Sequence, residues 1–309
     1  MHVHNDKNSR DSHAHHHGIT GEKGLLISIV LNAVITIAQF IGGILSGSLA
    51  LLSDAFHNLS DVFSMGISYI AILVGKKSKN SSKTYGYKRA EILAALLNIT
   101  TLFAVCAFII VEAVKRIQDP SPVNILIMSS VAFIGLAGNL VSVLLLYKHA
   151  KTNINIKSAF LHLLGDTLSS VAVLITALVM YFGGWYILDP IMSIAIALYI
   201  IKESFSVFMQ SINILMQATP AHLDKEKIRE RIKKETQLGI KAVHHMHIWD
   251  ITAGSTVFDA HVVVEKERLK DADDIIHAVN RILSEEFKIC HSTIQLESED
   301  FDHCTGCGI

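Results

Sequence analysis

Long apolar stretches separated by short polar connections occupy the first two thirds of the chain. Each stretch is close to the ~20 residues that an α-helix needs to cross the hydrocarbon core of a bilayer. The six predicted spans lie at 25–45, 49–74, 92–114, 123–147, 159–182 and 185–205. The pattern therefore predicts an α-helical membrane domain of six transmembrane helices within 25–210.

The pattern changes after Pro220, where charged residues become frequent and apolar residues recur with amphipathic spacing. Helices are predicted at 223–236 and 272–287, and strands at 242–251, 256–264 and 292–297. This αββαβ order predicts a small open sheet with helices on one face and a modest core of its own. We expect this cytoplasmic domain at 211–298, with a His-rich tail at 1–24 and a Cys-containing tail at 299–309.

Polar and small residues inside the spans have an expected role in helix packing. Hydrogen bonds between helices are expected from Asn32, Gln39, Asn98 and Asn139. Close approach of helices is expected at Gly42, Gly43, Gly135 and Gly138.

The composition agrees with a membrane protein. Hydrophobic residues make up 50% of the chain, charged residues make up 18%, and the mean hydropathy is +0.41. These values exclude a soluble enzyme and a disordered chain. The net charge of -1 argues against nucleic acid as a partner. The four cysteines do not suggest a disulfide framework, and 1–24 lacks the apolar core of a cleavable signal peptide.

Lysine and arginine residues gather on alternate connections between the spans. The basic residues on one side are Lys76, Lys77, Lys79, Lys83, Lys88 and Arg89, followed by Lys148, Lys151 and Lys157. The opposite connections hold only Lys115 and Arg116. Because basic residues favour the cytoplasmic side, both termini are predicted to be cytoplasmic. The compact length and short loops favour a bacterial inner membrane.

One ionisable pattern occurs twice inside the apolar spans. His57 is followed four residues later by Asp61, and His162 is followed four residues later by Asp166. Four residues are about one helical turn, so each histidine shares a helix face with its aspartate. Two such faces supply two imidazoles and two carboxylates, the ligand set of a tetrahedral divalent-metal site. The alternative is that both are packed histidines, hydrogen-bonded to the carboxylates of their own turns.

The donor atoms of this set favour Zn²⁺ as the transported ion, with Cd²⁺ and Co²⁺ as alternatives. Imidazole ligands suit zinc, whereas all-carboxylate sites suit manganese or magnesium. A histidine with a pKa of ~6.5 binds either a proton or a metal, so Zn²⁺ and H⁺ compete for one site. Alternating access would then exchange one ion for the other. Asp54, one turn before His57, is predicted to orient an imidazole or to act as a gate charge.

Five motifs together resemble a known family. In the membrane domain they read SLALLSDAFHNLSD at 48–61, YGYKRAE at 85–91 and HLLGD at 162–166. In the second domain they read HHMHIW at 244–249 and HSTIQLE at 291–297. The chain resembles the zinc-exporting branch of the cation diffusion facilitator family. The resemblance implies a homodimeric, proton-coupled exporter of zinc, with six helices and a ferredoxin-like metal-sensing domain in each subunit.

The resemblance also implies a second metal site, in the cytoplasmic domain near the dimer interface. Its implied ligands are His244, His261 and Glu297, where Zn²⁺ acts as a regulator rather than as the transported ion. Gln295 stands where some relatives have a histidine, which departs from a full binuclear site. His245 is expected to be a solvated surface residue.

Both tails contain further candidate metal ligands. The N-terminal tail holds His2, His4, His13, His15, His16 and His17. At the other end, Cys304 and Cys307 form a CxxC motif with zinc-knuckle spacing. Metal capture by these tails has solvated disorder as its alternative. Some relatives carry an Asp/His site between the second and third helices, but 76–89 contains neither residue type, so that site is predicted to be absent.

Three functions of different classes compete: a secondary antiporter, an intramembrane metalloenzyme and a membrane-bound metal receptor. A catalytic zinc usually keeps three protein ligands and an open position, whereas four ligands would close the shell. The HExxH motif of zinc proteases does not occur in the chain either. A receptor would bind metal without moving it across the membrane. The prediction is therefore a metal cation:proton antiporter and not an enzyme.

Overall fold

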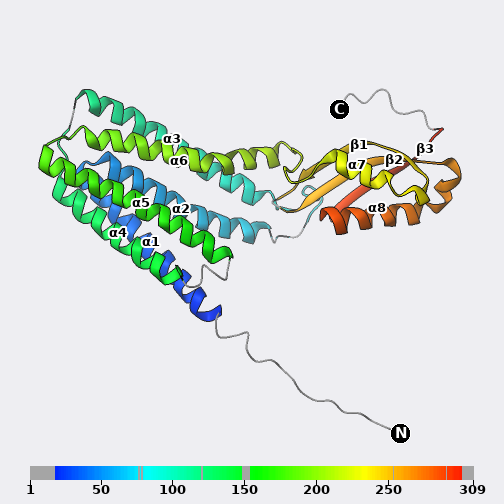
Figure 1. Cartoon of the computed structure of the whole chain (residues 1–309), viewed down its shortest axis with the longest axis horizontal. Coiled ribbons are helices and arrows are strands. Elements are labelled where there is room, and N and C mark those ends of the chain that lie inside the picture. Colours follow the sequence, from blue (N-terminus) through cyan, green and yellow to red (C-terminus); the bar gives the residue numbers. More distant parts are fainter. Residues whose placement is uncertain are drawn as a thin grey trace, which may run out of the picture. The chain divides into compact units, whose positions relative to one another are not determined.

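The computed structural model describes residues 18–75, 77, 79–119, 121–147, 154–252, 254–289 and 291–300. Six long helices precede a small α/β domain, as predicted (Figure 1). The helices are α1 (Gly18–Ser46), α2 (Leu49–Gly75), α3 (Ala90–Gln118), α4 (Ile125–Tyr147), α5 (Ile154–Gly183) and α6 (Leu188–Leu215). Each coincides with a predicted span, although α6 continues well beyond the predicted end at 205.

The surface of these helices is that of a membrane domain. Within the described residues, four stretches are long and apolar enough to cross a bilayer: Ala90–Gln118, Ile125–Tyr147, Phe160–Gly183 and Leu188–Leu215. Large apolar side chains point outward, with exposed fractions of 79% for Phe182 and 77% for Leu126. Polar side chains such as Gln39 and Asp54 are buried instead. This inversion of the usual soluble pattern is expected where lipid replaces water.

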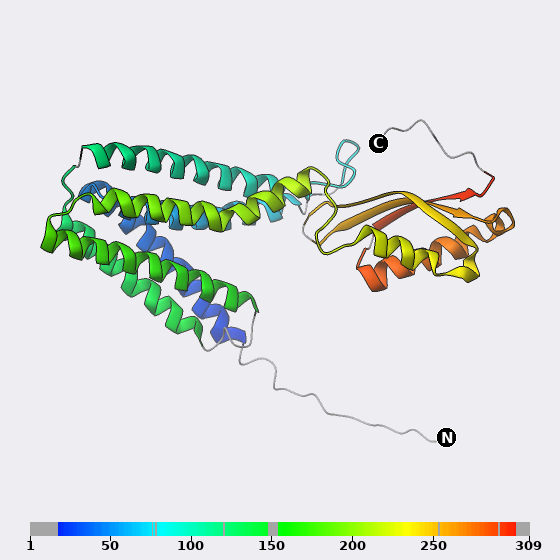
Figure 2. The ribbon, with the colours of Figure 1, turned by 45° about the horizontal axis from the view of Figure 1, so that its top comes forward.

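Helix α4 packs against both α1 and α5 (Figure 1, Figure 2). Small residues allow the close approach to α1, as predicted: a Cβ atom at Gly42 would lie 2.6 Å from Cγ2 of Val131. A larger residue at this position would push the two helices apart. This packing helps to position α5, which carries one of the two His/Asp pairs.

The predicted hydrogen bonds between helices form in part. Gln39 bonds to two residues of α2, and Asn98 of α3 donates to the hydroxyl of Ser60 on α2. The side chain of Asn139, by contrast, has no hydrogen-bond partner within the described part of the chain, so that prediction is wrong. Asn139 is nevertheless fully buried.

A buried carboxylate joins α6 to the start of α2. Asp189, in the first turn of α6, accepts a hydrogen bond from the hydroxyl of Ser48 at 2.5 Å. It also accepts from the backbone N–H groups of Leu49 at 2.8 Å and Ala50 at 3.3 Å. These N–H groups have no partner inside α2, and a negative charge is favourable at a helix N-terminus. The contact fixes α2, and therefore His57 on it, against α6.

The second domain confirms the predicted αββαβ order. Its elements are α7 (Lys225–Lys233), η2 (Thr236–Leu238), β1 (Ile240–Asp250), β2 (Thr256–Val264), η3 (Lys266–Asp271), α8 (Ala272–Phe287) and β3 (His291–Ser298). Helix α7 is shorter than predicted because Asp224 caps its N-terminus and the short turn η2 follows it. Strand β2 is central, antiparallel to β1 and parallel to β3, so the sheet is mixed.

Both helices of this domain lie on one face of the sheet, as predicted (Figure 2). Their apolar sides pack on the strands in a core that includes Ile228 and Ile232 of α7, Phe258 of β2, and Ile275 and Leu283 of α8. All five side chains are fully buried, and the core draws only on residues of this domain. The domain thus has a hydrophobic core of its own.

Candidate metal sites

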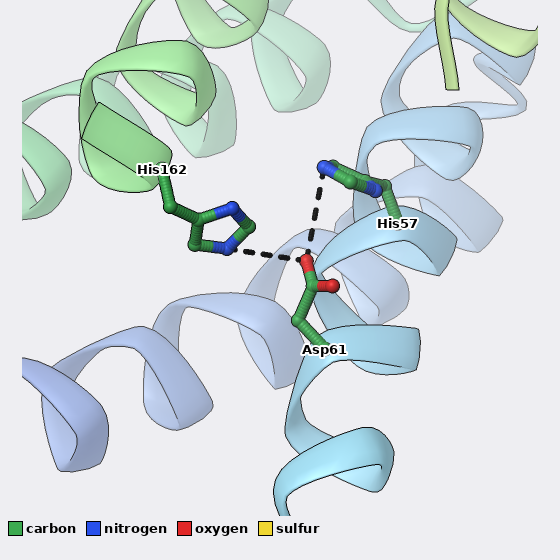
Figure 3. A group of neighbouring side chains, drawn as sticks. All are labelled: His57, Asp61 and His162. Carbon is green, nitrogen blue, oxygen red and sulfur yellow. Dashed lines mark ion pairs between the residues drawn. The ribbon is translucent and has the colours of Figure 1, made fainter. Parts of the chain in front are cut away.

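The two His/Asp pairs predicted from the sequence come together between α2 and α5. His57 and Asp61 lie one turn apart on α2, and His162 and Asp166 lie one turn apart on α5. Figure 3 shows the side chains of His57, Asp61 and His162 pointing toward one another. The carboxylate of Asp61 faces both imidazole rings, whose centroids are 5.9 Å apart.

Each imidazole Nε2 atom faces both carboxylates at similar distances. Nε2 of His57 lies 3.7 Å from Oδ2 of Asp61 and 3.8 Å from Oδ1 of Asp166. Nε2 of His162 lies 3.4 Å from Oδ2 of Asp61 and 3.6 Å from Oδ2 of Asp166. These separations are longer than ordinary hydrogen bonds. The two distances to Oδ2 of Asp61 are close to the edge of about 3.3 Å in a tetrahedron whose ligands lie about 2.0–2.1 Å from a central Zn²⁺, whereas Asp166 faces the two imidazoles with different oxygens.

Several polar atoms of this group are buried without a hydrogen-bond partner among the described residues. They are Nδ1 of His57, Oδ2 of Asp61 and Oδ2 of Asp166. A buried polar atom is costly unless something satisfies it. Histidines that merely packed against the carboxylates of their own turns would leave those oxygens bonded. The arrangement therefore favours a site that receives a ligand.

Exposure increases from one end of the group to the other. The side chain of Asp166 is 2% exposed and that of His57 is 12% exposed, whereas Asp61 and His162 reach 28% and 36%. Helices α2 and α5 run in opposite directions (Figure 1). Asp61, one turn further along α2, and His162, one turn earlier on α5, therefore lie toward the same end of the helices. The group is accessible from that end.

Asp54 lies one turn before His57 in a buried hydrogen-bond network. Its carboxylate accepts from Nε2 of Gln39 on α1 at 2.7 Å and from the hydroxyl of Ser169 on α5. Oε1 of Gln39 accepts from Nδ2 of Asn58 on α2 at 2.9 Å. These bonds hold α1 and α5 against α2 on the buried side of the group.

A small cavity of ≈ 10 Å³ adjoins His57, His162 and Asp166. Its lining comprises Asp54, His57, His162, Gly165, Asp166, Ser169, Ile196, Tyr199, Ile200 and Glu203. Tyr199 and Glu203 belong to α6 and were not predicted as site residues. Glu203 was missed because it falls next to the predicted end of the sixth span at 205, where charged residues are ordinary. A signal for it was present: a carboxylate one turn after a tyrosine on a face that is otherwise apolar.

The second predicted group also comes together, across the three strands of the cytoplasmic domain. His244 on β1 is paired with His261 on β2, and Glu297 lies on the adjacent β3. Nε2 of His244 lies 3.0 Å from Oε2 of Glu297, and Nδ1 of His261 lies 2.6 Å from Oε1. The amide of Gln295 also donates to Oε1 at 3.0 Å. Both oxygens of this buried carboxylate are therefore engaged by their neighbours.

The electrostatics of the second group favour a charged carboxylate. Burial opposes ionisation of Glu297, but the imidazoles of His261 and His244 outweigh it and hold the pKa of this carboxyl below its usual value. Within the described residues, two groups have His and carboxylate ligand atoms close enough to share one metal ion. They are His57, Asp61 and His162, and His244, His261 and Glu297.

A β-bulge adds a histidine that the sequence pattern did not reveal. In a regular strand, His244 and His245 would point to opposite faces. His245 instead has a left-handed backbone with φ 47, at an irregularity of β1 between His244 and His247. Its imidazole stacks on that of His261, with ring centroids 5.0 Å apart. His245 is exposed, as predicted, but it also contacts the candidate site.

The candidate ligands of the two tails lie outside the described residues. This holds for the histidines within 1–17 and for Cys304 and Cys307. Their role in metal capture stays a prediction.

Both domains match models of known protein families. Residues 25–216 match the family model described as the cation efflux transmembrane domain. Residues 220–299 match the one described as the cation efflux protein cytoplasmic domain. The chain belongs to the cation efflux, or cation diffusion facilitator, family. The resemblance drawn from the five motifs is thereby confirmed.

Several named relatives of this family cover nearly the whole chain. The cadmium, cobalt and zinc/H(+)-K(+) antiporter of Bacillus subtilis is 38% identical over 94% of this chain and 93% of its own length. The zinc transporter ZitB of Pectobacterium atrosepticum is 34% identical over 95% and 92%. The metal cation efflux system protein CzcD of Cupriavidus metallidurans is 33% identical over 92% and 89%.

Membership of the cation efflux family decides between the functional classes. The matched domains and the names of the relatives are those of transporters, so the chain is a multi-pass membrane transporter of divalent metal cations rather than an enzyme. The interpretation of the four-residue group as the centre of an intramembrane metalloenzyme is therefore set aside.

Proposed function

We propose that this protein exports Zn²⁺ from the cytoplasm in exchange for H⁺, by alternating access around His57, Asp61, His162 and Asp166. The proposal rests on the imidazole–carboxylate distances of 3.4–3.8 Å, which gather two imidazoles and two carboxylates closely enough for one ion to bind between them. Zinc appears in the names of two of the relatives, and cadmium and cobalt appear in one of them. Cd²⁺ and Co²⁺ are accordingly further candidate substrates.

The charges of the four side chains support an exchange mechanism. Asp61 and Asp166 together balance the two positive charges of the metal, which matters in a membrane interior where unbalanced charge is costly. The two imidazoles complete the shell through their Nε2 atoms while they are neutral. When the metal leaves, protons bind to the same imidazoles, and the resulting positive charges balance the negative charges of the two carboxylates. The empty, unprotonated site is the unbalanced form, so the protein is expected to reorient with one ion or the other bound.

The direction of access supports uptake from the cytoplasmic side. We place both termini in the cytoplasm because the basic residues favour that orientation, and the protein in a bacterial inner membrane. The more accessible members of the site, the half-buried Asp61 and His162, then lie toward the cytoplasmic ends of α2 and α5. This arrangement supports metal entry into the site from the cytoplasm.

The cytoplasmic domain at 211–298 is proposed to regulate transport and to bring two subunits together. Two imidazoles and a carboxylate, from His244, His261 and Glu297, fit a Zn²⁺ ion as donor atoms. The amide of Gln295 takes the place where a further imidazole would support a second ion. We therefore expect one regulatory zinc for each subunit at this site.

Purified protein in sealed proteoliposomes tests the proposed function. A zinc-sensitive dye inside the vesicles and a pH-sensitive dye in the same compartment would follow both ions after ZnCl₂ is added outside. Zinc uptake accompanied by alkalinisation of the lumen is expected, because protons leave as zinc enters. Zinc uptake without a pH change would refute exchange. Zinc binding without uptake would support a metal receptor instead.

A further inference from the structure

A third carboxylate lies beside the transport cavity but outside the four-ligand group. Glu203 of α6 lines the same cavity as His57, His162 and Asp166. Glu203 is exposed, whereas Asp166 is buried. Helices α5 and α6 run in opposite directions (Figure 1), so positions one turn later on α6 lie one turn closer to the start of α5. Glu203 therefore lies toward the end from which the site is accessible.

Tyr199 connects this carboxylate to the helix that carries half of the site. It lies one turn before Glu203 on α6, so the two side chains share a helix face, and both line the cavity. The Tyr199 hydroxyl lies above Gly165, where a Cβ atom would be 3.8 Å away. Gly165 directly precedes Asp166 on α5. Tyr199 thus packs the face of α6 that carries Glu203 next to the turn that bears His162 and Asp166.

The negative charge of Glu203 lies close to two of the proposed metal ligands. Its side chain lines the same small cavity as His162 and Asp166, which brings its carboxylate into electrostatic range of both. A solvated surface glutamate that pointed away from the cavity would have no such neighbours. A negative charge at the mouth of a narrow, low-dielectric cavity raises the local concentration of cations. Carboxylate oxygen is also a suitable first contact for a divalent ion that still holds part of its water shell.

We propose that Glu203 is a capture residue, which binds the incoming hydrated divalent cation at the cavity mouth before His162 and Asp166 bind it. Tyr199 is a positioning residue, because its side chain packs this face of α6 against Gly165 beside the cavity. The inference rests on the proposed transport site and adds a step that precedes it. In this scheme, Glu203 binds the incoming cation first, and the imidazoles determine which metal is selected.

Zinc flux into proteoliposomes, measured over a range of ZnCl₂ concentrations, tests the capture role. Glu203→Gln removes the charge and keeps the size, so the half-saturating concentration should rise about tenfold while the maximal rate stays within about twofold. Glu203→Asp should recover most of the loss, and Tyr199→Phe should give a smaller shift in the same direction. Glu112→Gln is the matched control, since Glu112 is an acid on α3 that pairs with Arg116 away from the cavity.

The outcomes test the capture role of Glu203 separately from the assignment of the transport site. A parent-like half-saturating concentration in Glu203→Gln would overturn the inference, and so would a lower maximal rate alone, which is the mark of a structural role. Asp61→Asn in the same experiment tests the proposed function: normal flux there would refute the transport site. Raising the salt concentration should also reduce the difference between the parent and Glu203→Gln, because screening weakens electrostatic capture.

Discussion

The membrane and cytoplasmic groups use the same residue types but hold them at different distances. Between α2 and α5, imidazole nitrogens lie 3.4–3.8 Å from the carboxylate oxygens. In the sheet, the equivalent distances are 2.6 and 3.0 Å. The first set is spaced for a central ion, and the second set is hydrogen-bonded directly. Composition alone does not distinguish a group prepared for an ion from one whose members satisfy each other.

The physical difference lies in what supports the side chains. In the membrane domain, packed helices and the network around Asp54 hold the donors apart, and some buried atoms of the group have no hydrogen-bond partner within the described ranges of the chain. In the sheet, the two histidines are partly exposed and approach Glu297 closely. A metal ion must displace those hydrogen bonds before it can bind. We therefore expect the membrane group to be preorganised and the cytoplasmic group to rearrange and to depend more strongly on pH.

The largest expected effect comes from removing a carboxylate of the membrane group. Asp61→Ala or Asp166→Ala removes one of four ligands and unbalances the charge, so zinc flux should fall by at least about a hundredfold. The protein should still insert and remain folded, which gel filtration in detergent would check. Asp119→Ala, at the exposed end of α3, is the control and should transport normally. Flux at the parent rate in either variant would contradict the assignment.

A change of metal preference is the next largest effect. His57→Asp converts the ligand set to three carboxylates and one imidazole, a harder site that should favour Mn²⁺ more than the parent does. Losing an imidazole should also move the pH dependence of transport to the acid side. Fluxes of Zn²⁺ and Mn²⁺ would be measured side by side from pH 5.5 to 8, with His277→Asp as the control. An unchanged metal ratio and an unchanged pH midpoint would remove His57 from the ligands.

The cytoplasmic group should respond to substitution through stability rather than flux. A ligand that binds only the folded state raises the melting temperature by mass action. His261→Ala should therefore reduce the zinc-induced shift in melting temperature of the fragment 220–300, which contains the whole core of this domain. His277→Ala, an exposed histidine of α8, should keep the full shift. An unchanged shift in His261→Ala would place the regulatory metal elsewhere.

The smallest expected effect is a pH dependence of the metal-free cytoplasmic domain. The pKa of Glu297 is held below its ordinary value of 4.5 by the two imidazoles, in spite of burial. Its stabilising contribution is therefore complete above that value and is lost as the pH falls through the lower, folded-state pKa. Melting temperatures in EDTA from pH 6.5 to 3.5 should fall less steeply for Glu297→Gln than for the parent fragment. If the melting temperatures of the two fragments fell in parallel with pH, the contacts of Glu297 would not contribute to stability.

The sequence predicted those parts of the protein that depend on local pattern. Six spans follow from apolar length, and the pairing of His57 with Asp61 follows from one helical turn. The contact of His245 with His261 was not predictable, since it depends on a bulge that interrupts the alternation of β1. Nor was the contact of Asp189 with α2, because nothing local relates two residues about 140 positions apart. Tertiary packing, not propensity, determines both.

X-ray absorption at the zinc edge tests the central claim most directly. The sample would be the chain shortened to 18–300 and carrying His244→Ala and His261→Ala, so that the membrane group is the intended zinc site. The account predicts one zinc per chain, with two imidazole nitrogens and two oxygens at about 2.0–2.1 Å. Adding His57→Ala should then remove one imidazole from the spectrum. A shell of oxygen alone, or two imidazoles that persist without His57, would contradict the proposed transport site.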